Sequence, residues 1–61
     1  PAIGMTKYEA LQAMRKEPDK IASIDGGERW TFECADSDGF THDCYVLDFR
    51  DDIVVRFRDM D

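Results

Sequence analysis

The sequence predicts a small α+β domain in which one N-terminal helix packs on a four-stranded antiparallel meander sheet. Three observations predict this class: a helix-capping signal near the N-terminus, four β-prone runs after it, and turn-forming residues between those runs. The connections are shorter than the crossover of about a dozen residues that parallel strands require, so the strands should be antiparallel. No repeat or linker interrupts the chain, and we expect a single domain.

The helix is predicted to begin immediately after Thr6. Thr6 and Glu9 have the spacing of a capping box, in which each side chain bonds the backbone N–H of the other residue. Leu11 and Met14 form an apolar stripe at helical spacing. Pro18 should end the helix, because the residue before a proline is disfavoured in the helical conformation. About three turns are too short to be stable alone, so this helix must dock on the sheet.

Four strands are expected over residues 20–24, 28–35, 40–49 and 53–58. They are separated by Asp25-Gly26-Gly27, Asp36-Ser37-Asp38-Gly39 and a three-residue loop, Arg50-Asp51-Asp52. Side-chain alternation then selects the face that meets the helix. The nine residues expected on that face are Trp30, Phe32, Cys34, Tyr45, Leu47, Phe49, Ile53, Val55 and Phe57. The opposite face should be mixed and largely solvated, carrying Arg29, Thr31, Glu33, His42, Cys44, Val46, Asp48, Val54, Arg56 and Arg58.

Length and charge restrict the function. A chain of 61 residues has little volume left for the closed, water-excluding site of a small-molecule enzyme, so catalysis is not expected. The net charge of −6 opposes direct binding to nucleic acid or an anionic membrane and favours a basic protein partner. No transmembrane or signal-peptide pattern is present, and a cytosolic monomer is expected. Residues 1–4 precede Met5 and are expected to be a cloning remnant, which leaves 5–61 as the native domain.

The two cysteines are expected to remain free thiols. An even-numbered loop between the second and third strands would place Cys34 and Cys44 on opposite sheet faces, which excludes a disulfide unless a β-bulge shifts one strand. Free thiols also suit a reducing cytosol.

No catalytic, metal or cofactor site is expected. The possible ligands Cys34, Asp36, His42, Asp43 and Cys44 match no zinc spacing, and the acidic turn at Asp36 lacks the glutamate that would complete a calcium loop. A nucleophile built from His42 and Cys44 would have no third group to orient it. The paired acids Asp51 and Asp52 fall in a turn without a cleft.

The distribution of acids is the most informative feature. A meander would place Asp25, Glu28 and the pair Asp51-Asp52 at one end of the sheet. It would place Asp36, Asp38, Asp59 and Asp61 at the other, with Glu17 and Asp19 beside them. At about 3.3 Å per residue, the ends would lie roughly 20 Å apart, a layout similar to phosphate rows on duplex DNA. Turns also favour aspartate for backbone reasons, and this simpler explanation stays open.

The capped helix over residues 6–16, the four-strand pattern, the short length and the acidity together resemble the small anti-CRISPR proteins of phages and mobile elements. That class has no common motif, so no residue is carried over by position. The resemblance implies inhibition without chemistry: binding to a type I surveillance complex (Cascade), with subtype I-C as the candidate, in the cytoplasm of a bacterial host. Such a DNA mimic would use its carboxylates to block target DNA. The expected contact residues are Asp36, Asp38, Asp51, Asp52, Asp59 and Asp61, with Asp25, Glu28, Asp43 and Asp48 in reserve.

Two other classes remain open. An antitoxin or immunity protein that binds a basic nuclease would use the same acids. A structural or regulatory module could instead pair with itself through the edge strand at residues 20–24.

Overall fold

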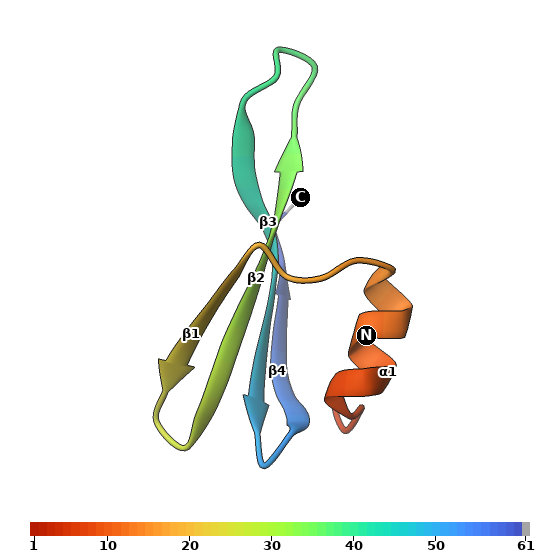
Figure 1. Cartoon of the computed structure of the whole chain (residues 1–61), viewed down its shortest axis with the longest axis vertical. Helices are drawn as coiled ribbons and strands as arrows, with labels where there is room; N and C mark the ends of the chain where they lie inside the picture. Colours follow the sequence, from red (N-terminus) through yellow and green to blue (C-terminus); the bar gives the residue numbers. More distant parts are fainter. Residues whose placement is uncertain (61) are drawn as a thin grey trace.

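The computed structural model describes residues 1–60. Helix α1 (Lys7–Met14) is followed by strands β1 (Lys20–Ile24), β2 (Gly27–Ala35), β3 (Thr41–Arg50) and β4 (Ile53–Asp59). The strands form one antiparallel sheet in the order β1-β2-β3-β4, and α1 lies on one face of it (Figure 1). The predicted α+β class and meander topology are confirmed.

Helix α1 begins as its capping signal predicts. The Thr6 side chain accepts a hydrogen bond from the Glu9 backbone N–H at 3.2 Å, and the Glu9 carboxylate accepts one from the Thr6 N–H at 2.9 Å. The helix ends earlier than Pro18 led us to expect. Arg15 adopts a left-handed conformation with φ of 60°, and its N–H donates to the Leu11 carbonyl at 2.9 Å, which closes the last turn.

The segment before the helix lies along the outer edge of β4. The Gly4 N–H donates to the Val54 carbonyl at 2.9 Å, and the Val54 N–H donates to the Met5 carbonyl at 2.8 Å. Gly4 was expected to belong to a cloning remnant, yet it takes part in this pairing. The segment covers one edge of the sheet near the start of β4, whereas β1 forms the opposite edge.

The core lies between α1 and the covered face of the sheet. Trp30, Phe32, Leu47 and Phe49 are buried there as predicted. The indole of Trp30 packs against the Phe49 ring with 4.5 Å between centroids. From the helix, fully buried Ala10 enters this cluster, and Leu11 and Met14 pack around it.

The turn between β3 and β4 is shorter than predicted. Arg50 pairs with Ile53, so the loop has two residues, Asp51 and Asp52, with φ values of 53° and 64°. A two-residue hairpin with both φ values positive has the backbone of a type I′ turn, whose twist matches that of the flanking strands. The expected three-residue loop is therefore wrong.

The shorter loop reverses which residues of β4 face the helix, and a β-bulge in β4 reverses this assignment again from Arg56 onward. Phe49 pairs with Val54, but Asp48 pairs with Arg56, so Val55 is the extra residue. Val54 is fully buried in the core and Val55 is 48% exposed on the other face, the reverse of the prediction for both.

The other two residues of β4 that were predicted to face the helix differ from each other. Ile53 is half-buried opposite Arg50, on the side of the sheet away from Phe49. The prediction for Ile53 is therefore wrong, because the loop has two residues and not three. Phe57 lies opposite Leu47 on the expected face and stacks on Tyr45 at 6.3 Å between centroids. It remains 44% exposed.

A second β-bulge, in β3, brings the two cysteines together. Phe32 pairs with Tyr45 but Glu33 pairs with Asp43, which leaves Cys44 as the extra residue in β3. Cys44 consequently turns toward Cys34, and the two form a disulfide with 5.7 Å between their Cα atoms. The expectation of free thiols is wrong. Strict alternation would place the two cysteine side chains on opposite faces of the sheet, and the extra residue in β3 places them on the same face.

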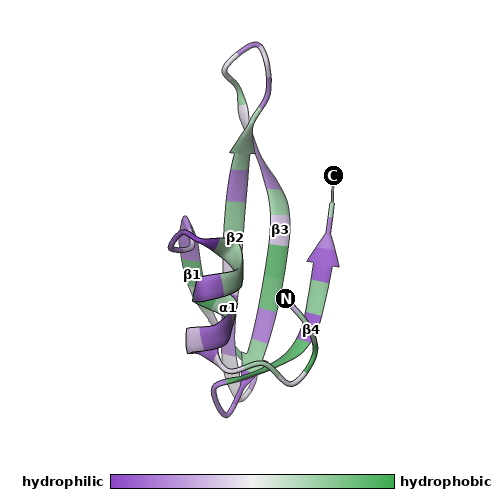
Figure 2. Ribbon diagram, turned by 90° about the vertical axis from the view of Figure 1, so that its right-hand side faces the viewer, coloured by the Kyte–Doolittle hydropathy of each residue, from purple (hydrophilic) through white to green (hydrophobic). Residues whose placement is uncertain are grey.

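Beyond the disulfide, β2 and β3 continue as a two-stranded arm. β1 begins at Lys20 opposite Thr31, and β4 ends at Asp59 opposite Tyr45, so neither strand flanks the arm. The arm projects from the sheet in Figures 1 and 2 and accounts for the elongated shape, 38 × 22 × 16 Å. The disulfide lies at the base of the arm.

Candidate binding surfaces

One acidic surface is formed where two turns meet. Pairing of Gly27 with Arg50 brings the β1–β2 and β3–β4 turns side by side, so Asp25, Glu28, Asp51 and Asp52 lie at one end of the sheet. A Cβ atom at Gly27 would overlap the Phe49 carbonyl, so this close approach requires glycine. We call these four acids the acidic end. Their grouping agrees with the arrangement that the meander predicts.

One cation, Lys7, partly neutralises the acidic end. The Lys7 ammonium lies 2.8 Å from the Glu28 carboxylate and 3.0 Å from that of Asp52. These bonds raise the pKa of Lys7, and the bond from Lys7, followed by one from the Trp30 indole, lowers the pKa of Glu28. Asp52 is still 79% exposed. The carboxylates of Asp25 and Asp51 form no ion pair with any of residues 1–60.

At the tip of the arm, Asp36 and Asp38 are the two predicted contact acids, and the Asp36 carboxylate stabilises the loop itself. Asp36 Oδ1 accepts hydrogen bonds from the backbone N–H groups of Asp38, at 2.9 Å, and Phe40, at 3.0 Å. This is an Asx turn, which fixes the loop. Asp38 is exposed, and beside it the Phe40 ring is 71% exposed.

The other acids do not gather at that tip. Asp59 lies opposite Tyr45, at the base of the arm, and Asp61 lies outside the described residues. Asp19 accepts a hydrogen bond from the Glu33 N–H at 2.7 Å, and this bond is the main reason why its pKa is lowered. The predicted second acidic end is therefore spread along the arm rather than formed as one cluster.

Two of the four acids held in reserve as contacts, Asp43 and Asp48, form ion pairs on the sheet face away from α1. Asp48 is 5% exposed and accepts both donors of the Arg29 fork, at 2.8 and 3.2 Å. Hydrogen bonding from Arg29 is the main cause of the lowered pKa of Asp48. Asp43 lies 3.2 Å from the ammonium of Lys20, which also pairs with Glu33 at 3.2 Å.

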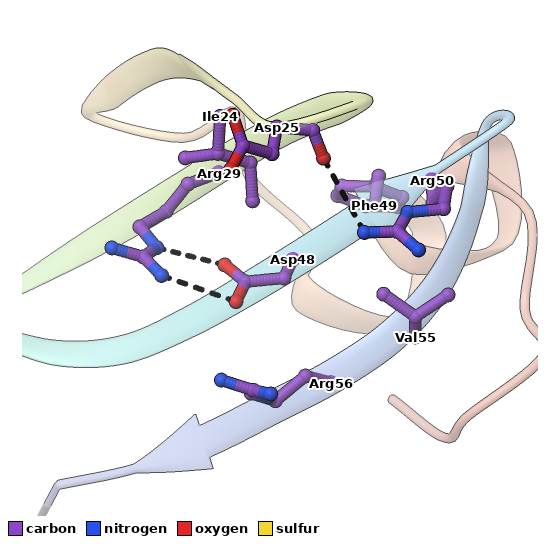
Figure 3. Close-up of a pocket in the computed structure, with 8 residues that line it drawn as sticks. All are labelled: Ile24, Asp25, Arg29, Asp48, Phe49, Arg50, Val55 and Arg56. Carbon is purple, nitrogen blue, oxygen red and sulfur yellow. Dashed lines mark hydrogen bonds and ion pairs between the residues drawn. The ribbon is translucent and has the colours of Figure 1, made fainter.

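That same face, which we call the open face, carries a shallow pocket lined by arginines. Arg29, Arg50 and Arg56 surround Asp48 there, and the Arg50 guanidinium donates to the Asp25 carbonyl at 3.4 Å (Figure 3). Strand alternation assigns Arg29 and Arg56 to this face, but the sequence interpretation treated the face as an ordinary mixed surface. Its excess of arginine is visible once the register is known.

Three chemical features of the described residues bear on catalysis, metal binding and membrane insertion. The Cys44 sulfur is bonded to Cys34, so in this form it is not a thiol nucleophile beside His42. Within residues 1–60, no group of three or more His, Cys, Asp or Glu side chains is arranged to hold a metal ion. Within the same residues, no helix is long and apolar enough to cross a membrane.

The fold and its surfaces define a small α+β domain with charged surfaces of opposite sign. No family model, curated protein or solved structure matches the chain.

Proposed function

We propose that the protein is a non-catalytic, stoichiometric inhibitor that binds the basic, DNA-binding surface of another protein through its acidic end. The specific form of the proposal is an anti-CRISPR protein that occupies the DNA-binding surface of a type I surveillance complex. The observation that carries it is the conformation of Asp51 and Asp52.

Both residues occupy left-handed positions of the β3–β4 turn. Asn-Gly is the favoured pair in such a turn, because asparagine tolerates this conformation and glycine adopts it without steric cost. Two adjacent aspartates add electrostatic repulsion to the conformational cost. A local choice that opposes stability at an exposed turn supports a role in binding.

The chemistry of a DNA-binding surface suits this turn. Lysine and arginine side chains that hold phosphates can instead form charge-assisted hydrogen bonds with carboxylates. The carboxylates of Asp25 and Asp51 are not occupied by ion pairs within residues 1–60, and the net charge of −6 favours steered association with a positive partner.

Action in a bacterial cytoplasm requires that the reduced protein also binds, since disulfides are rare in that compartment. The disulfide lies at the base of the arm, toward the end of β2 and away from the β3–β4 turn. Both redox forms should therefore present the same acidic end.

The test is binding to a purified type I surveillance complex, with and without target duplex, at low and high salt. We expect salt-sensitive binding that competes with the duplex. The double variant Asp51→Asn/Asp52→Asn should weaken binding at least about tenfold, since two charge-assisted contacts are lost. The control variant is Glu17→Gln, which removes one charge from an exposed acid outside the acidic end and is compared with the single variant Asp51→Asn. No binding by the unmodified protein, or equal loss of binding in Asp51→Asn and Glu17→Gln, would contradict the proposal.

A second candidate is an immunity-type protein that binds a basic nuclease, and exposed Phe40 favours it. Aromatic side chains often dominate the binding energy of protein interfaces, and this ring is 71% exposed beside Asp38 at the tip. In this case Phe40→Ala should weaken inhibition of a basic nuclease more than Asp51→Asn does. The reverse order would favour the acidic end.

A further inference from the structure

The open face is positively charged although the chain as a whole is acidic. The protein has 8 Lys and Arg residues and a net charge of −6. Strand register places Lys20, Arg29, Arg50, Arg56 and Arg58 on the face away from α1. That face carries only three of the acids within strands, namely Glu33, Asp43 and Asp48. Most of the cations therefore gather on one side of the molecule.

Cross-strand pairing arranges these cations in rows. Arg29 pairs with Asp48 and Asp48 with Arg56, so two arginines flank one carboxylate. In the next row, Val46 lies between Thr31 and Arg58. Strands lie about 4.8 Å apart and alternate residues about 6.8 Å apart, so the guanidinium groups are spaced within reach of one extended chain.

The carboxylate in the first row forms hydrogen bonds with only one of these arginines. Both oxygens of Asp48 accept from Arg29, which forms the fork pair in Figure 3. The guanidinium groups of Arg56 and Arg58 are exposed and form no side-chain hydrogen bond or ion pair within residues 1–60, although both charges help to lower the pKa of Asp48. Two guanidinium groups thus remain available beside an internally satisfied pair, and arginine is well suited to bidentate recognition of anions.

We propose that the open face binds an extended, carboxylate-rich segment of a partner protein. The partner's carboxylates would bond Arg56 and Arg58, while its apolar atoms would cover Val46, which lies in the row of Arg58, and exposed Val55 beside Arg56. This surface is separate from the acidic end, and it requires a partner of the opposite charge.

A protein segment fits the surface better than a nucleic acid does. Carboxylates border the arginines on both sides, with Asp25 at the edge of the pocket and the Glu33–Asp43 pair toward the arm. A long row of phosphates would cross these borders and meet repulsion, whereas a short acidic peptide can stay within them.

The experiment uses the full chain and a fluorescently labelled oligoglutamate peptide, with binding followed by anisotropy and mapped by amide chemical shifts. We expect shifts concentrated on the open-face residues of β3 and β4. Arg56→Gln and Arg58→Gln should each weaken binding about fivefold. Arg15→Gln removes the same charge from an exposed arginine at the end of α1 and should have little effect.

Three results would overturn the inference. The first is equal weakening by Arg15→Gln, which would indicate general charge attraction. The second is tighter binding of an oligothymidylate of the same length, which would assign the face to nucleic acid. The third is an increase of the protein's own mass with concentration that Arg56→Gln abolishes, which would assign the face to a second copy. Asp51→Asn/Asp52→Asn should not weaken oligoglutamate binding, so the outcome is independent of the function proposed above.

Discussion

Cys34 and Cys44 are bonded to each other across β2 and β3, although the cross-strand partner of Cys34 is His42. The bulge at Cys44 makes this diagonal bond possible, with 5.7 Å between the two Cα atoms. The bond closes the hairpin whose tip carries Asp36 and Phe40. It therefore constrains an arm that no other strand flanks.

Reducing this disulfide should lower the free energy of unfolding by about 2 to 3 kcal/mol, because a loop of this length no longer restricts the unfolded chain. Urea denaturation with and without a reductant measures the change. The double variant Cys34→Ser/Cys44→Ser should match the reduced protein and show no further response to reductant. Equal stability of the oxidised and reduced forms would show that the bond does not constrain the unfolded chain.

Val54 and Val55 provide a matched test of the bulge in β4. Val54→Ala removes two buried methyl groups and should destabilise the fold by about 2 kcal/mol. Val55→Ala changes an exposed side chain and should stay within about 0.5 kcal/mol of the unmodified protein. Thermal or chemical denaturation compares the two. The opposite order would restore the side-chain alternation predicted from the sequence.

Asp48 should contribute stability that depends on pH. Arg29 lowers the folded-state pKa of Asp48 below the usual value of about 3.9, so protons bind more readily to the unfolded chain. The contribution is complete above the unfolded-state pKa and is lost as the pH falls through the folded-state pKa. Asp48→Asn should cost about 1 to 2 kcal/mol at neutral pH.

The difference between that variant and the unmodified protein should shrink as the pH falls from about 5 to about 2, because a protonated Asp48 no longer accepts a charge-assisted bond. Denaturation curves measured across this range check the trend. Asp38→Asn, at the exposed arm tip, is the control and should change neutral-pH stability little. If the two proteins differ in free energy of unfolding by the same amount at all pH values, the ion pair is not the cause of the difference.

Asp51 should show opposite effects on stability and on binding. Asp51→Gly relieves a left-handed conformation and one repulsive contact, and should raise the free energy of unfolding by about 0.5 to 1 kcal/mol. The same change should weaken binding to a basic partner. Asp51→Asn keeps the tolerance for positive φ and removes only the charge, so it separates the two effects. A loss of stability in Asp51→Gly would contradict the argument that this aspartate opposes stability.

Local signals in the sequence determined the parts of the fold that local chemistry controls. Thr6 and Glu9 set the start of α1 because both capping bonds form within one turn. Short connections determined the meander, and with it the meeting of the turns that holds Asp25 and Asp51. These features depend on residues close together in the chain.

Only the tertiary structure decided the positions of the two bulges. A bulge depends on how neighbouring strands pair across the sheet, and it cannot be predicted from the alternation of polar and apolar residues in one strand. The bulge at Val55 placed Val54 in the core, and the bulge at Cys44 placed its sulfur beside Cys34. Pairing of distant strands likewise gathered the arginines of the open face, because their charges lie on three strands that are neighbours only in the folded sheet.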